Sequence, residues 1–142
     1  MTEKEKMLAG MVYSAVDKQL LDELYAVKEI VHRYNSISPA DGSERWAILK
    51  GLLGHSGDDD VIINQPFYCD YGKQISVGKR FFANFNFTVL DEARVTIGDD
   101  CFIGPNVTFT QRVTALTLLK GIPVRNGRNL SLSVTMSGSA AV

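Results

Sequence analysis

Apolar positions follow two different periods along this 142-residue chain, and the period changes near residue 57. Over residues 17–34 apolar side chains recur every three to four positions, which predicts one buried stripe of an α-helix. Asp17 suits the N-cap of this helix because its carboxylate can accept a hydrogen bond from a free backbone N–H. After the break "SISPADG", the segment "SERWAILKGLLG" predicts a second helix that stops at Gly54.

Beyond the acidic linker "GDDD" the apolar positions recur every six residues, with one step of eight that implies a two-residue loop inserted between turns. A period of six is typical of a parallel β-helix, in which each unit makes one strand and one corner and three strands make a coil. An antiparallel pair of alternating strands also fits, but the two in-phase "IG" units of "VTIGDDCFIGPNV" favour the coil. The side chains predicted to face the interior are Val77, Ala83, Val89, Ile97, Ile103 and Phe109.

From Thr110 onward the chain has neither period, and it is rich in Ser, Asn and Gly. This composition predicts a loosely attached tail. Without further coils, the last coil would then expose unpaired strand edges, which favour aggregation.

Charge and composition exclude several classes of protein. The net charge of −1 argues against a nucleic-acid or membrane-surface binder, since both rely on basic patches. No apolar run approaches the roughly 18 residues of a membrane helix, and the charged N-terminus lacks the apolar region of a signal peptide, so we expect a cytoplasmic location. Cys69 and Cys101 lie far apart, and with His32 and His55 they form no recognisable metal cluster, so we expect packed thiols and no metal.

Several segments together carry a resemblance to a known family. "EKEKMLAGMVYSAVD", "EIVHRYN", "PFYCDYG", "FFANFNFTVLDEARVTIGD" and "IGPNVTF" are similar to segments of the maltose and galactoside O-acetyltransferases, which are hexapeptide-repeat enzymes. The resemblance covers residues 1–109. It implies a left-handed parallel β-helix with an N-terminal α-helical cap, assembled as a homotrimer, that moves an acetyl group from acetyl-CoA as co-substrate to a hydroxyl of a sugar acceptor.

Periodicity and resemblance together predict a mainly β protein, a truncated left-handed parallel β-helix of about two coils behind an α-helical cap. We expect the helical cap over residues 1–56, the hexapeptide-repeat β-helix over residues 57–109, and an aberrant, frame-shifted tail over residues 110–142.

The resemblance also implies five acceptor contacts, at positions that match the family's sugar site: Asp17, Asp70, Asn84, Asp91 and Glu92. Carboxylates and amides suit a sugar because they can accept hydrogen bonds from, or donate them to, adjacent hydroxyls. Two of the five have structural alternatives, since Asp17 could simply cap a helix and Asn84 could form a side-chain ladder at a coil corner. Leu24 and Ala26 stand where relatives often carry arginine, so the resemblance does not define the sugar.

The chain departs from the family in its chemistry. A sugar hydroxyl is a poor nucleophile at neutral pH, so acetyl transfer needs a base, which in the family is a histidine soon after "GPNV". This chain has no histidine after His55, and the coils that form the family's CoA groove do not follow. We therefore assign no catalytic and no CoA-binding residue. Two functions remain open, a sugar O-acetyltransferase and a non-catalytic remnant or interaction module that keeps the cap and the first coils.

A one-base slip explains where the repeat stops. Codons can be chosen for residues 134–140 so that a reading frame that starts at the third base of the first codon encodes D-D-V-W-I-G. This peptide is a hexapeptide unit. The same shift allows a tyrosine at Phe109–Thr110 and a histidine at Val113–Thr114. The constant shift across the tail indicates that the reading frame, rather than the fold, changes after Phe109.

Overall fold

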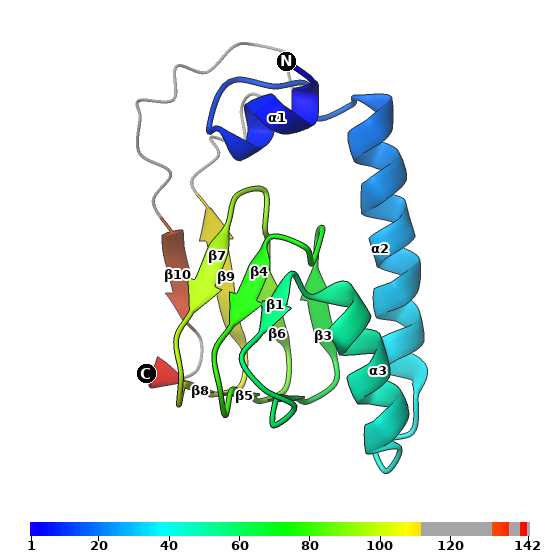
Figure 1. Ribbon diagram of the computed structural model, residues 1–142, viewed down its shortest axis with the longest axis vertical. Coiled ribbons are helices and arrows are strands. Elements are labelled where there is room, and N and C mark those ends of the chain that lie inside the picture. The colour runs from blue at the N-terminus through cyan, green and yellow to red at the C-terminus, as the bar shows by residue number, and fades with distance from the viewer. Residues whose placement is uncertain (112–131, 137–139, 142) are drawn as a thin grey trace.

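A computed structural model describes residues 1–111, 132–136 and 140–141 of the chain. Three helices precede nine short strands, and two more strands follow in the C-terminal part (Figure 1). The helices are α1 (Glu3–Leu8), α2 (Lys18–Ser36) and α3 (Gly42–Leu52). The strands are β1 (His55–Ser56), β2 (Ile62–Ile63), β3 (Phe67–Cys69), β4 (Ile75–Val77), β5 (Phe82–Ala83), β6 (Phe87–Val89), β7 (Val95–Ile97), β8 (Phe102–Ile103), β9 (Val107–Gln111), β10 (Leu132–Met136) and β11 (Ala140–Ala141).

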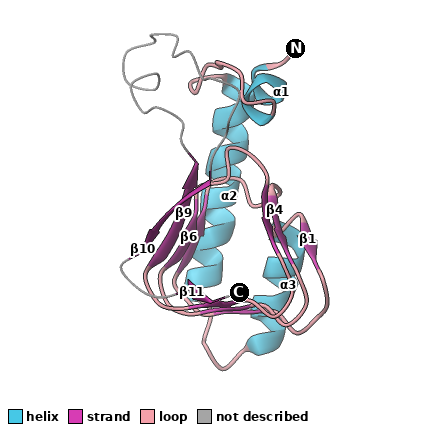
Figure 2. Cartoon of the chain, turned by 90° about the vertical axis from the view of Figure 1, so that its left-hand side faces the viewer, coloured by secondary structure: helices cyan, strands magenta, loops and turns pink. Residues whose placement is uncertain are grey.

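The two predicted helices are confirmed as α2 and α3. Asp17 caps α2 as predicted, because its carboxylate accepts a hydrogen bond from the backbone N–H of Leu20 at 3.2 Å. The sequence reading missed the short helix α1, which begins with a capping box between Thr2 and Glu5. These helices form the cap of the structure, and α2 runs along one side of the strands (Figure 2).

Strands β1 to β9 wind into three parallel sheets that form the three sides of a prism (Figure 2). Parallel pairing joins β1–β4–β7, β2–β5–β8 and β3–β6–β9, and from the second side of the first coil onward each partner lies 20 residues further along. The predicted parallel β-helix is therefore confirmed, including the eight-residue step that adds two residues to each coil. The expected number of about two coils is wrong, because β1, β2 and β3 form a further coil before Ile75.

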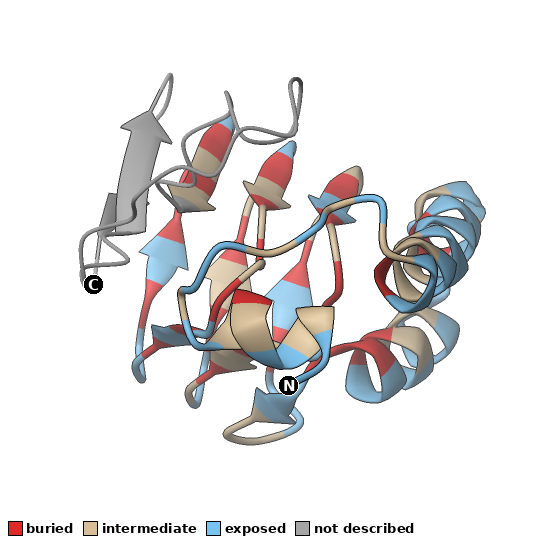
Figure 3. Cartoon of the chain, turned by 90° about the horizontal axis from the view of Figure 1, so that it is seen from above, coloured by how far each residue is buried: buried red, intermediate tan, exposed pale blue. Residues whose placement is uncertain are grey.

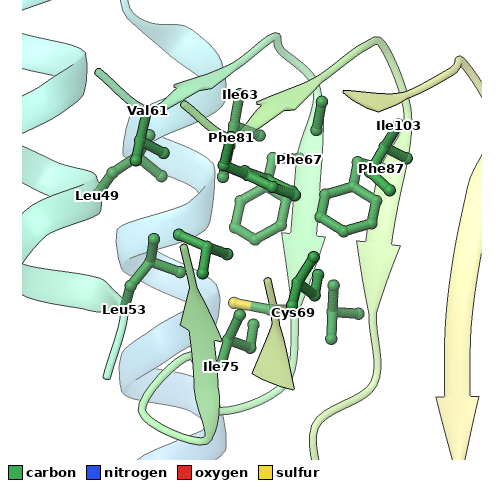
Figure 4. Packing of buried hydrophobic residues seen from close by; sticks show 14 of the residues in the cluster. Leu49, Leu53, Val61, Ile63, Phe67, Cys69, Ile75, Phe81, Phe87 and Ile103 are labelled. Atoms are coloured by element: carbon green, nitrogen blue, oxygen red, sulfur yellow. The ribbon is translucent and has the colours of Figure 1, made fainter. Parts of the chain in front are cut away.

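The six-residue pattern places its side chains inside the prism as predicted. The residues at those positions are no more than 8% exposed. Aromatic rings fill the centre, where Phe87 stacks on Phe67 at 5.8 Å and meets Phe109 edge-on at 5.5 Å. Figure 4 shows Ile63 and Cys69 of the first coil inside the same cluster, and Figure 3 shows buried residues alternating along the coloured strands with more exposed ones.

Close stacking of the coils, rather than an unusual backbone angle, explains the glycine that follows Val77. A Cβ on Gly78 would lie 2.5 Å from the backbone of Gly98 and Asp99 in the next coil. Among non-glycine residues of the described part, positive φ angles fall on corner residues spaced one coil apart, and Asn86 donates from its side chain to that of Asn106 at 3.0 Å. The side-chain ladder that we considered for Asn84 is thus made two residues further on.

The C-terminal strands correct the expectation of an open coil with a loose tail. β10 pairs antiparallel with β9 over five residues, and β11 pairs antiparallel with β8 over two. They lie where strands of a following coil would pair, but they run in the opposite direction (Figure 1). The backbone groups at two of the three strand edges are therefore partnered. Val113 and Thr114, where a slipped frame would read histidine, lie outside the described residues.

The two cysteines are packed thiols, as predicted. Cys69 and Cys101 are both buried, and burial raises the pKa of each thiol. In the part of the chain that the structure describes, no helix combines the length and the apolar character needed to cross a membrane.

Candidate functional site

Three of the predicted acceptor residues meet at one corner of the β-helix, which we call the acidic corner: Asp70, Asp91 and Glu92. Asp70 follows β3, and Asp91 and Glu92 follow β6 in the next coil. The Asp91 Oδ1 atom accepts hydrogen bonds from the backbone N–H groups of Asp70 at 3.1 Å and Tyr71 at 2.8 Å. Asp91 is fully buried, so its main contact is with the backbone of the coil before it.

Burial sets the charge of the acidic corner. It raises the pKa of Asp91 to about 6, because the loss of water outweighs the hydrogen bond from the Tyr71 N–H. The pKa of Glu92 is raised further, first by burial and then by a hydrogen bond to the side chain of Asp70 and by the charge of that carboxylate. The raised pKa of Glu92 favours its protonated form, and Glu92 and Asp70 share a hydrogen bond between their side chains.

Two tyrosines lie beside the acidic corner, Tyr13 from the helical cap and Tyr71 from the turn after β3. Tyr71 packs in a small cluster with Met7 of α1 and Leu20 of α2, and Tyr13 packs against the same cluster. Burial raises the pKa of Tyr13 to about 12, and the charges of Glu92 and Asp70 add to this effect. Both phenols therefore remain neutral hydrogen-bonding groups beside the carboxyl pair.

The other two predicted residues lie elsewhere. Asn84 follows β5 at a different corner, where its Oδ1 accepts the backbone N–H of Phe85 at 2.8 Å. Asp17 caps α2, whose first turn contributes Leu20 to the cluster around Tyr71. The chain therefore brings together three of the five predicted acceptor residues, with Asp17 on the neighbouring cap and Asn84 at another corner.

A cleft that the sequence reading missed opens beside Asp70. It has a volume of about 410 Å³ and lies between α2 and β3, with Lys28 and His32 on the helix and Tyr68 on the strand. The spacing of the helical residues would have placed them on one face, but nothing in the pattern indicated which strand that face meets. Among the described residues, no group of three or more His, Cys, Asp or Glu side chains is arranged to hold a metal ion.

Similarity to known proteins agrees with this architecture. Residues 6–57 match the family model of the maltose acetyltransferase hexapeptide capping motif. The chain is 42% identical over 139 residues to nodulation protein L of Rhizobium meliloti (strain 1021), in an alignment that takes in 91% of this chain and 74% of that protein. Residues 1–109 make up less than 91% of the chain. The similarity to this relative therefore extends past the residues that carry the resemblance.

Solved structures have the same fold. A maltose O-acetyltransferase from Clostridium difficile 630 superposes with a TM-score of 0.74 at 35% identity, over 82% of this chain and 63% of that one. A galactoside acetyltransferase in complex with coenzyme A gives a TM-score of 0.72 at 30% identity, over 80% of this chain and 57% of that one. The chain thus matches less than two thirds of the length of either solved enzyme.

A helical cap followed by parallel coils of stacked hexapeptides defines a hexapeptide-repeat protein with a left-handed β-helix. More narrowly, the chain belongs to the family of maltose and galactoside O-acetyltransferases.

Proposed function

We propose that the described part of the chain is the acceptor side of a sugar O-acetyltransferase. The reaction moves an acetyl group from acetyl-CoA to a hydroxyl of a maltose-type or galactoside-type sugar. The observation that carries this proposal is the acidic corner, where Asp70, Asp91 and Glu92 meet under the helical cap in a chain of this family.

Each residue of the acidic corner has its own part in holding a sugar. Asp91 fixes the backbone of Asp70 and Tyr71 from below, so it positions the corner and does not itself reach the acceptor. Glu92 and Asp70 share one hydrogen bond, and the remaining carboxyl oxygens of the pair can accept hydrogen bonds from the hydroxyls of a sugar. Asp17 and Asn84 lie away from this pair, so their part in acceptor binding rests on the resemblance to the family alone.

Acetyl transfer needs a base, and this chain lacks the histidine that acts as the base in the family. No histidine follows His55 in the 142 residues, and none of the described residues is assigned to acetyl-CoA. We therefore propose that the chain as written does not transfer acetyl groups. In the intact family form we expect a cytoplasmic homotrimer.

One observation favours the second candidate function, a non-catalytic remnant or interaction module. β10 and β11 pair antiparallel with β9 and β8, at the edges where a following coil would pair in parallel. A chain that turns back in this way partly closes its own β-helix instead of extending it.

The DNA sequence around codons 105–115, together with an activity assay, tests both parts of the proposal. We expect a frame that one restored base near codons 109–110 returns to hexapeptide units and a histidine. A restored chain should release CoA thiol from acetyl-CoA in the presence of maltose or a galactoside. If no single-base change restores the repeat, or if the restored chain is inactive with both sugars, the proposal fails.

A further inference from the structure

The cleft between α2 and β3 shares a wall with the acidic corner. Asp70 lines the cleft and also pairs with Glu92, so one carboxylate faces both places. Any acceptor held at the acidic corner by Asp70 therefore lies beside this cleft. A ligand longer than one sugar ring could continue from the corner into it.

The helical wall of the cleft is polar. Lys28, His32 and Asn35 are spaced by four and three residues, which places them on one face of α2. Lys28 and His32 are exposed, and both can hydrogen-bond with hydroxyl groups. Hydrogen-bond donors along one wall can bind the successive hydroxyl groups of a saccharide.

The strand wall presents an aromatic ring. Tyr68 points outward from β3 and is 48% exposed, whereas its neighbours Phe67 and Cys69 face the core. An aromatic face beside hydrogen-bonding groups is typical of a small-molecule cleft, and the apolar C–H face of a sugar ring packs on such a surface. The volume of about 410 Å³ lies within the range of about 300–1,000 Å³ that is usual for ligand clefts.

The two walls are held rigidly against each other. The Asn35 side chain donates to the Phe67 carbonyl at 3.0 Å and accepts the Phe67 N–H at 2.9 Å. Tyr34 meets the Phe67 ring edge-on at 6.4 Å from the same turn of α2. These contacts fix the helix on the strand, as the side-by-side course of α2 and β3 shows (Figure 1), so the cleft is formed before any ligand arrives.

We propose that the cleft between α2 and β3 is a second saccharide subsite, with Tyr68 as the stacking platform and Lys28 and His32 as hydroxyl contacts, so that the acceptor is an oligosaccharide. This inference rests on the proposed function, since it extends the acceptor site at Asp70. The ligand that it assigns to this cleft is the second ring of a neutral acceptor sugar.

Calorimetric titration of the full chain tests this subsite without any need for catalysis. The probes are methyl α-glucoside, maltose and maltotriose, and in a second series methyl β-galactoside and lactose. In at least one of the two series, we expect the longer sugars to bind about tenfold more tightly than the single-ring glycoside. Tyr68→Ala should then weaken the longer sugar roughly threefold to tenfold and leave the single ring unchanged. His32→Ala should also act only on the longer sugar.

Phe102→Ala is the matched control, because Phe102 is 49% exposed on the outer side of β8 and does not line the cleft. It should leave every affinity unchanged, and circular dichroism should give all variants the spectrum of the parent. Equal affinity for short and long sugars in both series overturns the second subsite while the acceptor site at Asp70 stands. Failure of all five sugars to bind overturns the proposed function as well, and an equal effect of Tyr68→Ala and Phe102→Ala removes Tyr68 from the subsite.

Discussion

The Asp91 carboxylate accepts the backbone N–H of Asp70, which precedes it by about one coil, at 3.1 Å, and it is fully buried while doing so. The same oxygen accepts the N–H of Tyr71, so one side chain holds the whole turn that carries Asp70. Gly72 completes this turn with a φ of 76°, and a Cβ there would lie 2.8 Å from the carbonyl oxygen of Leu52. The position of Asp70 therefore depends on buried hydrogen bonds and on close packing against the cap.

Removing the Asp91 side chain should destabilise the fold more than neutralising it. Asp91→Ala leaves two N–H groups without their acceptor, at a cost of about 1–3 kcal/mol for each donor that stays buried. Asp91→Asn keeps an oxygen at that place and removes a buried charge, so it should cost less. Urea unfolding at pH 7 measures both free energies. Equal destabilisation by the two variants would show that these hydrogen bonds do not hold the turn.

Stability should fall as pH rises between about 5 and 9, because of Glu92. Its pKa in the folded chain is raised above the ordinary value of 4.5, so over this window the folded state binds more protons than the unfolded state. The free energy of unfolding must then decrease with pH, and Asp91 adds to the decrease between 3.8 and about 6. Glu92→Gln should flatten the pH dependence measured by urea unfolding.

Glu29→Gln is the control for this pH effect, because it removes the same charge from an exposed site on α2. It should leave the slope of stability against pH as in the parent chain. If Glu92→Gln keeps the full slope as well, another group titrates in this range.

The aromatic column should carry much of the stability of the coils. Phe87 is 1% exposed and contacts the rings of Phe67, Phe81 and Phe109. Phe87→Ala should lower the free energy of unfolding by about 3–5 kcal/mol. Phe102→Ala removes a half-exposed ring that stacks on Phe82 at 4.8 Å, and should cost about 1 kcal/mol. A similar loss for both variants in urea unfolding would contradict the central place of Phe87.

The antiparallel pairing of β10 with β9 can be tested with proline. In an antiparallel pair, successive N–H groups of one strand point alternately toward and away from its partner. Of Val134→Pro and Thr135→Pro, one should therefore remove a hydrogen bond to β9 and the other should not. Hydrogen exchange of the β9 amides should accelerate in one variant more than in the other. Unchanged exchange in both would mean that β10 does not protect β9.

How much could be predicted from the sequence depended on local patterns. The six-residue period predicted the coils from Val77 onward, because the residues that face inward recur at fixed steps and several of them are followed by glycine. The first coil escaped because Ile63 is followed by Asn64 and Cys69 by Asp70, so the "IG" signature is missing although both side chains are buried. The burial pattern is the same in the two cases, and only the corner differs.

The site was predicted in part for a similar reason. A 20-residue coil brings the corner after β3 beside the corner after β6, so Asp70, Asp91 and Glu92 meet as a consequence of the repeat. The cleft lined by Tyr68 depends instead on how α2 docks on β3 through Asn35. The direction of β10 is likewise a long-range property, since the composition of the tail carries no period that would define its pairing.

The central claim is that this chain keeps the acceptor side of the family and lacks the base for transfer. The most direct measurement is the release of CoA thiol from acetyl-CoA by the purified 142-residue chain, with and without maltose or a galactoside. We predict no sugar-dependent release for the chain as written, and release by the frame-restored chain, reduced by Asp70→Asn. Sugar-dependent turnover by the 142-residue chain itself would contradict the account, because it would require a base other than the family's histidine.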